Sequence, residues 1–303
     1  MSRTIPGFVT LAIVAAVLGA TASIAAEVVD ARGEVIKADN PSRILSIGGD
    51  TTEIVYALGF GSNVVAVDTS SQFPPEVLAK KKVGYMRALS TEGVLSTGAT
   101  LILANAHAGP PEVIRALATS SVPLVMLPEN ASPESLIEKV KLVGRALGAE
   151  AKANDLAAQL NGQFGSLETV RSKIERPVRA LLVLSVDGGR ALAAGRGTTA
   201  DLMLELAGAT NAAADLNGYK PVSDEALIEM APQAIVAVRR APEEEIAADI
   251  AALPGFKALG AGRKVPIITM DAAYLLGFGP RAPRAAGELM AQLYPDLPNQ
   301  VAR

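Results

Sequence analysis

Short aliphatic runs alternate with helix-type patterns along the first half of the chain. The runs are four or five residues long and rich in Ile, Leu and Val, which is typical of strands that are buried on both faces. Strands that alternate with helices at this spacing predict a parallel sheet covered on both sides. The expected strands are 44–47, 64–67, 101–104 and 123–127, and the expected helices are 51–58, 92–96 and 111–119.

The same alternation returns in the second half of the chain and predicts a second α/β unit. A β-hairpin is expected ahead of the first unit, turning around Ala31–Gly33. In the second unit the expected strands are 180–184, 234–238 and 265–268, and helices are expected to begin near Thr199, Ser223, Glu243 and Pro283.

A long helical pattern separates the two units, from residue 150 to about 174. Its apolar residues recur at steps of three or four, which predicts one buried stripe along the helix: Leu156, Leu160, Phe164, Leu167, Val170 and Ile174. At about 1.5 Å per residue this helix would measure roughly 38 Å, enough to act as a stiff strut between two lobes. We therefore predict two doubly wound α/β lobes, 27–149 and 176–303, joined by a single long helix, 150–175.

The amino terminus has the pattern of a secretory signal peptide. Arg3 precedes an uncharged apolar run over 8–18, and small residues follow over 21–26, so cleavage is expected near Ala25 or Ala26. The alternative is a membrane anchor, because the uncharged run from 8 to 26 is just long enough to span a bilayer. The chain has no cysteine, which excludes a cysteine-linked lipid and any disulfide, so a free periplasmic protein is expected.

Charge and residue types narrow the range of functions. The formal net charge is -3, and removing Arg3 with the signal peptide makes it -4, so nothing predicts binding to nucleic acid. Zinc sites of the usual kind are excluded, because cysteine is absent and His107 is the only histidine. The stretch 195–199 contains two glycines but lacks the ending of a P-loop. The sequence therefore predicts a protein that is not an enzyme.

One segment, Val83–Leu95 (VGYMRALSTEGVL), resembles the signature of periplasmic haem-binding proteins of bacterial haem importers. Weaker matches to the same family lie at 46–49, 52–59, 194–198 and 275–281. The resemblance implies two α/β lobes joined by one helix, with the ligand held in a cleft between them. It also implies a monomeric carrier that binds haem and delivers it to the permease of an ABC importer.

By position, Tyr85 matches the tyrosine that ligates haem iron in this family. A phenolate is a hard anionic ligand suited to ferric iron, and a nearby cation favours that anion over the neutral phenol. Arg87 matches a family arginine near the iron-bound oxygen. Arg239 matches a second arginine of the cleft, and Arg240 is its rival for that role.

Two further residues are candidates for the haem site. Some family members contribute a histidine from the second lobe near 186–189, and this chain has none there. His107 lies instead in the loop after a first-lobe strand, and such loops surround the binding crevice of open α/β sheets. Tyr219 is expected to form part of the cleft wall.

Glu92 and Glu225 match the positions at which related proteins present one acidic residue per lobe to arginines of the permease. One carboxylate on each lobe suits docking on a two-fold membrane partner. The alternative is a local role, because both glutamates begin helices, where the helix dipole stabilises negative charge.

Three other functions are consistent with parts of the sequence. A ferric-siderophore or cobalamin carrier has the same fold, although those relatives line the cleft with more aromatic residues and this chain has no tryptophan. An exported metal-dependent enzyme would use Asp50, Asp68 or Asp187, which the spacing instead places in caps and turns. A structural envelope protein would bind no small ligand tightly.

Overall fold

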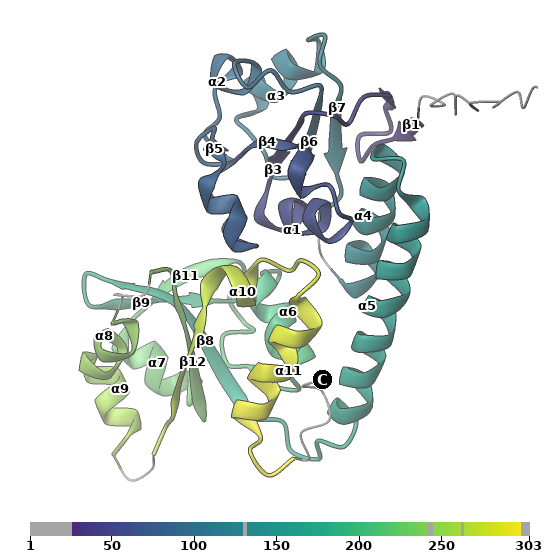
Figure 1. The fold of residues 1–303 in the computed structure, drawn as a ribbon. Coiled ribbons are helices and arrows are strands. Elements are labelled where there is room, and N and C mark those ends of the chain that lie inside the picture. The colour runs from purple at the N-terminus through teal and green to yellow at the C-terminus, as the bar shows by residue number, and fades with distance from the viewer. Residues whose placement is uncertain (1–25, 130–131, 242–244, 262–263, 298–303) are drawn as a thin grey trace, which may run out of the picture.

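The computed structural model describes residues 26–129, 132–241, 245–261 and 264–297 as two lobes beside one long helix (Figure 1). Residues 1–25, which carry most of the predicted signal peptide, lie outside the described residues. Within the described part of the chain, no helix combines the length and the apolar character needed to cross a membrane.

The first lobe is built on a parallel sheet with the strand order β5-β4-β3-β6-β7. Helices α1 and α4 cover one face, and α2 and α3 cover the other, so the predicted two-sided covering is confirmed. The strands are β3 (Ile44–Ile47), β4 (Val64–Val67), β5 (Lys81–Lys82), β6 (Leu101–Asn105) and β7 (Leu124–Leu127). The helices are α1 (Gly49–Ala57), α2 (Thr91–Leu95), α3 (Pro111–Ala118) and α4 (Pro133–Ala146), with short 3-10 turns at Gly61–Asn63 and Pro75–Ala79.

The strand order places a topological switch between β3 and β6. From β3 the chain adds β4 and β5 on one side, and then returns to add β6 and β7 on the other. Loops that leave neighbouring strands in opposite directions open a crevice at the carboxyl edge of such a sheet, where ligands bind in open α/β folds. The first lobe therefore offers its binding surface at the ends of β3 and β6.

Helix α4 was not predicted from the sequence. It begins with a reciprocal cap in which the Ser135 amide donates to Ser132 Oγ at 3.3 Å and the Ser132 amide donates to Ser135 Oγ at 2.9 Å. Pro133 occupies the first helical position, where its missing N–H costs no hydrogen bond. A serine followed by a proline is a recognised sequence signal for the start of a helix. The hairpin of β1 (Ala26–Val29) and β2 (Val35–Ala38), by contrast, is as expected.

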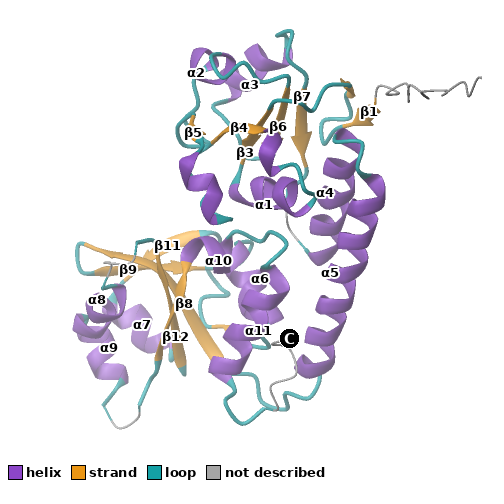
Figure 2. Ribbon diagram, viewed as in Figure 1, coloured by secondary structure: helices purple, strands orange, loops and turns teal. Residues whose placement is uncertain are grey.

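Figure 2 shows the sheet of the second lobe with helices around it. The sheet is mixed, its strand order is β11-β9-β8-β12-β13, and β10 pairs with β8. Strands β8, β12 and β13 are parallel, as the α/β prediction requires, whereas β9 pairs antiparallel with both β8 and β11. Neither β9 nor β11 was predicted. The strands are β8 (Arg179–Asp187), β9 (Arg190–Ala194), β10 (Thr210–Asn211), β11 (Tyr219–Val222), β12 (Ala234–Arg239) and β13 (Ile267–Asp271). The helices are α6 (Thr199–Leu206), α7 (Asp224–Met230), α8 (Ile246–Ala252), α9 (Pro254–Leu259), α10 (Ala272–Leu276) and α11 (Ala282–Leu293).

Helix α5 (Glu150–Arg171) runs beside both lobes, which confirms the predicted strut (Figure 1). Its 22 residues span about 33 Å. The buried stripe packs on α4 of the first lobe and on α6 and α11 of the second, and one apolar cluster extends through it from lobe to lobe. The stripe consists of Ala153, Ala157, Leu160, Phe164, Leu167 and Val170. Because this stripe is buried against both lobes, the two lobes share one continuous apolar core.

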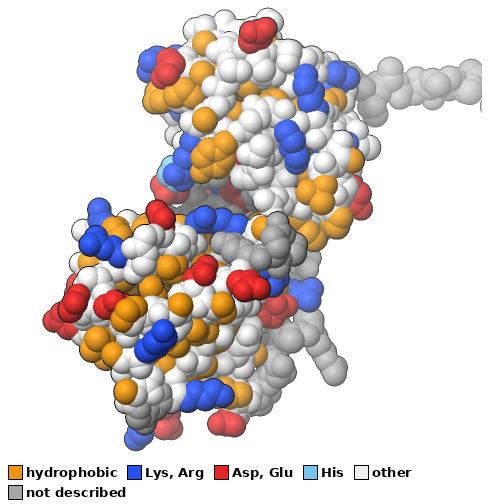
Figure 3. Space-filling view, turned by 90° about the vertical axis from the view of Figure 1, so that its left-hand side faces the viewer, with side chains coloured by type: hydrophobic (Ala, Val, Ile, Leu, Met, Phe, Trp, Pro, Cys, Tyr) orange, Lys and Arg blue, Asp and Glu red, His pale blue; other side chains and the backbone are white. Residues whose placement is uncertain are grey.

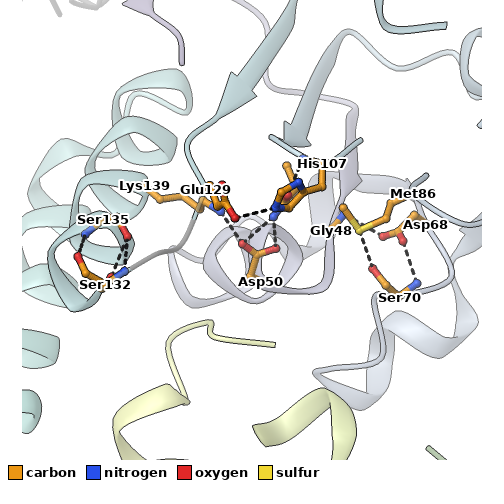
Figure 4. A network of polar contacts seen from close by, with 11 residues as sticks. Gly48, Asp50, Asp68, Ser70, Met86, His107, Glu129, Ser132, Ser135 and Lys139 are labelled. Carbon is orange, nitrogen blue, oxygen red and sulfur yellow. Dashed lines mark hydrogen bonds and ion pairs between the residues drawn. The ribbon is translucent and has the colours of Figure 1, made fainter. Parts of the chain in front are cut away.

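A buried ion pair attaches α4 to α1 below the carboxyl edge of the first sheet (Figure 4). The fully buried Lys139 places its Nζ 2.6 Å from Asp50 Oδ2, and Asn105 Nδ2 donates to both carboxylate oxygens, at 3.0 and 3.1 Å. Asp50 lies in the first turn of α1, where the helix dipole favours its charge. Because Asp50 follows β3 and Asn105 ends β6, the hydrogen bonds between Asn105 and Asp50 also connect the two strands on either side of the switch point.

We expect Lys139→Met to lower the free energy of unfolding by about 3–5 kcal/mol, because it leaves a buried carboxylate without its counter-charge. Urea unfolding followed by circular dichroism measures the change. Lys141→Met, an exposed position on the same helix, serves as the matched control and should change stability by no more than about 0.5 kcal/mol. A loss at Lys139 no larger than the ~1 kcal/mol typical of exposed pairs would contradict the role of this pair.

Candidate functional site

A cleft lies between the carboxyl edges of the two sheets. Figure 3 shows the surface narrowed between the lobes, with charged side chains of both signs close to this waist. A cavity of about 430 Å³ opens here, and both lobes contribute to it. Its lining from the first lobe comes from α1, which follows β3, from the loops after β4, β5 and β7, and from the end of β6 with the loop after it. From the second lobe it includes Thr199, Arg240, Ala272, Ala273, Leu276, Gly277 and Phe278. The ligand cleft predicted between the lobes is therefore present.

A second hollow, of about 620 Å³, adjoins the first and extends along the second lobe. The two hollows share Arg87, His107, Glu129, Thr199 and Leu276 in their linings. Their volumes lie in the range of roughly 300–1,000 Å³ that is typical of small-molecule sites. The shared wall makes them one elongated site.

Tyr85 stands on the first-lobe wall of this cleft, with 49% of its surface exposed. Gly84 has a φ of +96°, a conformation that glycine adopts without strain, and it turns the chain just before the tyrosine. The Gly84 carbonyl accepts from Thr69, and the Tyr85 carbonyl accepts from the Ala88 amide at 2.8 Å. The Met86 carbonyl accepts from Gly109, which ties this loop to the loop after β6. These bonds present the phenol from a fixed backbone.

Arg87 and Tyr219 face each other across the second hollow. Arg87 is exposed and lines both hollows, whereas Tyr219 is half-buried on β11. Burial raises the pKa of the Tyr219 hydroxyl, while a hydrogen bond with Thr198 and the positive charge of Arg87 act in the opposite direction. The structure thus brings a first-lobe cation close to a second-lobe phenol.

His107 lies at the mouth of the cleft and lines both hollows. Its Nε2 is 3.0 Å from Glu129 Oε1, and its amide donates to Asn105 Oδ1 at 3.0 Å (Figure 4). Since Asn105 also bonds Asp50, the buried Lys139–Asp50 pair holds the loop that carries His107.

The two second-lobe arginines are placed differently. Arg240 lines the first hollow and donates to the Leu184 carbonyl at 3.3 Å. Arg239 ends β12, pairs in register with Asp271 of β13, and is not among the residues that line either hollow. The placement favours Arg240 over Arg239 as the second arginine of the cleft.

The predicted docking residues lie outside both hollows, one on each lobe. Glu92 is exposed in the first turn of α2, and Glu225 is exposed in the first turn of α7. Each helix is capped by a serine hydroxyl, from Ser90 and Ser223 respectively. A hydrogen bond with Ser223 is the main cause that lowers the pKa of Glu225, so this carboxylate is ionised at neutral pH.

Several residues of the cleft were not identified from the sequence. Phe73 and Phe278 supply apolar surface, and Glu129 supplies the partner of His107. Phe278 belongs to the 275–281 segment that carried part of the family resemblance, which was an available signal. Phe73 and Glu129 lie in loops without a recognisable motif, and only their position in space brings them to the site.

The carboxylates considered for a metal-dependent enzyme have other partners or lie apart. Asp50 pairs with Lys139, and Asp68 accepts from the amides of Gly48 and Ser70 and from the Ser71 hydroxyl. Asp187 ends β8 in the other lobe. Over the described ranges, no group of three or more His, Cys, Asp or Glu side chains is arranged to hold a metal ion.

Comparison with known sequences identifies a protein family and several related proteins. The model of the periplasmic binding protein family matches residues 44–274. An uncharacterised ABC transporter substrate-binding lipoprotein, YvrC of Bacillus subtilis (strain 168), is 27% identical over 259 residues, covering 84% of this chain and 81% of its own. The vitamin B12-binding protein of Pectobacterium atrosepticum is 26% identical over 257 residues, covering 84% and 88%.

Solved structures with the same fold include two heme-binding proteins. The periplasmic heme-binding protein BhuT, in complex with two hemes, has a TM-score of 0.78 and 35% identity, covering 84% of this chain and 99% of its own. A periplasmic heme-binding protein from Pseudomonas aeruginosa has a TM-score of 0.77 and 33% identity, covering 85% and 94%. With a family match that extends from β3 to α10, and with two lobes around a shared cleft, this chain belongs to the periplasmic binding protein family.

Proposed function

We propose that this protein binds haem in the interlobe cleft and delivers it to the permease of an ABC importer. The observation that carries the proposal is Tyr85, a half-exposed phenol on the cleft wall with Arg87 two residues further along the same loop. A tyrosine oxygen is an established type of haem-iron ligand, and an adjacent cation favours its anionic form.

The rest of the cleft suits a flat, largely apolar ligand that carries carboxylates. Phe73, Leu276 and Phe278 supply apolar walls, and Arg87 and Arg240 supply cations that can pair with carboxylate or with iron-bound oxygen. His107 and Tyr219 lie near enough to contact a ligand that fills both hollows. The identity of 35% to a heme-binding protein over almost that protein's whole length supports the same ligand class.

Cobalamin is the second candidate ligand, because vitamin B12-binding proteins are 26% identical to this chain over most of its length. Those relatives share the fold, and family membership alone does not separate the two ligands. Tyr85 favours haem, since its oxygen is a suitable ligand for ferric iron.

Delivery requires a partner in the membrane, and we propose that Glu92 and Glu225 dock on it. The two carboxylates are exposed, lie on different lobes, and leave the cleft between them free.

We further propose that the protein acts as a monomer in the periplasm after cleavage near Ala25 or Ala26. Since the chain has no cysteine, it cannot carry a cysteine-linked lipid.

Titration of the mature protein with ferric haem, followed by absorbance, tests the ligand. We expect saturable binding with a tyrosinate-to-iron charge-transfer band, and Tyr85→Phe should abolish that band because it removes the ligating oxygen. Arg87→Gln should weaken binding roughly tenfold to a hundredfold, since a hydrogen bond to a charged group contributes about 1.5–3 kcal/mol.

Tyr56→Phe is the matched control, because Tyr56 lies in the same lobe and does not line the haem cleft; its spectrum should equal that of the wild type. Saturable binding of cobalamin but not of haem would replace the proposed ligand. Haem binding with an unchanged spectrum in Tyr85→Phe would keep the carrier function and exclude Tyr85 as the ligand.

Docking is tested with the importer reconstituted in liposomes. Glu92→Gln and Glu225→Gln should each raise the concentration of haem-loaded protein needed for half-maximal ATPase stimulation by about fivefold, which corresponds to an exposed ion pair of ~1 kcal/mol. Haem affinity should stay at the wild-type value. Glu112→Gln, an exposed glutamate on α3, is the control and should not alter stimulation. If Glu92→Gln and Glu225→Gln need the same concentration for half-maximal stimulation as Glu112→Gln, the docking assignment is refuted.

A further inference from the structure

Glu53 and Arg281 join the two lobes directly. Glu53 lies in α1 of the first lobe, and Arg281 immediately precedes α11 of the second, 228 residues further along the chain. The guanidinium forms a two-pronged contact, with Nε 2.9 Å from Glu53 Oε2 and Nη2 2.5 Å from Oε1. Paired N–H donors that match a carboxylate in this way fix its direction as well as its distance.

Aromatic rings hold the same guanidinium in place. The Arg281 guanidinium carbon lies 3.7 Å from the ring centre of Phe73 in the first lobe, and 5.0 Å from that of Tyr274 in the second. Both distances are within the range of a cation–π contact. Arg281 therefore contacts the first lobe at two side chains, Glu53 and Phe73, while a second-lobe ring supports it from its own side.

The pair stands between the ligand cleft and a separate hollow. Glu53 and Phe73 line the cleft, and together with Arg281 they also line a third cavity, of about 750 Å³, which lies against α5 and is called the rear hollow here. On the α5 side the rear hollow is bounded by Leu156, Gln159 and Leu160. The Glu53–Arg281–Phe73 contact is thus the partition that forms the back of the cleft.

Burial makes the contact costly to break. Only 8% of the Glu53 surface is exposed, and burial raises the pKa of its carboxyl, whereas the hydrogen bonds and the charge of Arg281 oppose that rise. Separating the lobes at this point would break two charge-assisted hydrogen bonds between Arg281 and the Glu53 carboxylate. Hydrogen bonds of this kind are stronger than neutral ones, so the pair resists opening.

We propose that Glu53, Arg281 and Phe73 form an interlobe clasp that sets the aperture of the cleft before the ligand binds. The clasp closes the back of the cleft and holds the Phe73 ring as part of its wall. Arg281 is a positioning residue in this scheme, since it lines the rear hollow and acts on the ligand site through Glu53 and Phe73. The proposal deepens the function proposed above, but it does not depend on which ligand the cleft holds.

Distance measurement between spin labels on the two lobes tests the clasp without any ligand. The chain has no cysteine, so Glu112→Cys on α3 and Lys257→Cys on α9, both exposed, provide one unique label pair. We expect a single narrow distance distribution for the parent protein. Arg281→Gln and Glu53→Gln should each broaden it and add a population at a different distance. The double variant should resemble either single one, because the two residues act through one contact.

Arg284→Gln is the matched control. Arg284 lies three residues further along, pairs with Glu288 of its own helix, and has a largely exposed side chain, so its loss should leave the distance distribution unchanged. Arg281→Lys keeps the charge but not the paired donors, and serves if Arg281→Gln does not fold. A narrow, unshifted distribution in folded variants of both Arg281 and Glu53 would overturn the proposal.

Ligand affinity provides the second readout. If Arg281→Gln leaves the cleft in its competent arrangement one tenth of the time, the apparent affinity for haem falls about tenfold, while the tyrosinate band of the bound form is unchanged. A broadened distance distribution with wild-type affinity would show that the aperture does not limit binding, and would reject that part of the proposal. Should the parent protein fail to bind haem, the proposed ligand would be wrong, and the label distances would still decide whether the clasp exists.

Discussion

The apolar contact between α5 and both lobes is the interaction on which the rest of the structure depends. Six buried side chains along this helix belong to one cluster that includes residues of α1, α4, α6 and α11. Because dense packing leaves little room for sliding, a helix embedded in both cores sets how far apart the two sheets lie. The cleft is the space that this spacing leaves between the two carboxyl edges.

The polar surface of the cleft follows from the topology of the sheets. Parallel strands bring all their carboxyl ends to one edge, so the segments that follow the five strands of the first lobe reach the same hollow. Hydrogen bonds between these loops then restrict them. Asn105 bonds Asp50 across the switch point, and the Met86 carbonyl accepts from Gly109, so the loops that carry Tyr85 and His107 are tied to the same framework.

Buried charges perform two distinct tasks in this molecule. The Lys139–Asp50 pair lies within the first lobe and fixes local structure beneath the site. The Glu53–Arg281 pair crosses between the lobes and lies beside the ligand cleft. Buried ion pairs add little net stability compared with apolar packing, but removing one partner is expensive, which makes them effective at specifying one arrangement. The Glu53–Arg281 pair supplements the strut, because it joins the lobes at a second place away from the apolar stripe of α5.

Much of the architecture was determined by the sequence itself. Local patterns were sufficient for the β1–β2 hairpin, for β3, β4, β6 and β7 of the first lobe, for the long helix and for the alternation of the second lobe, because side-chain periodicity reports directly on which face of an element is buried. The short edge strand β5 was not predicted. The segment around Tyr85 was identifiable as well, since its residues are consecutive in the chain. Helix α4 was also within reach, from the start signal at Ser132 and Pro133.

Only the tertiary structure decided which strands pair and which side chains meet. Strand β9 pairs antiparallel with β8 and with β11, and periodicity does not report the direction in which strands pair. Phe73 and Glu129 enter the cleft, and Arg240 rather than Arg239 faces it, because of the way loops and strand ends are oriented. Glu53 meets Arg281 across 228 residues of chain, and no local pattern encodes a contact of that separation. Sequence periodicity specifies which face of each element is buried, whereas the packing of both lobes on α5 specifies which residues meet.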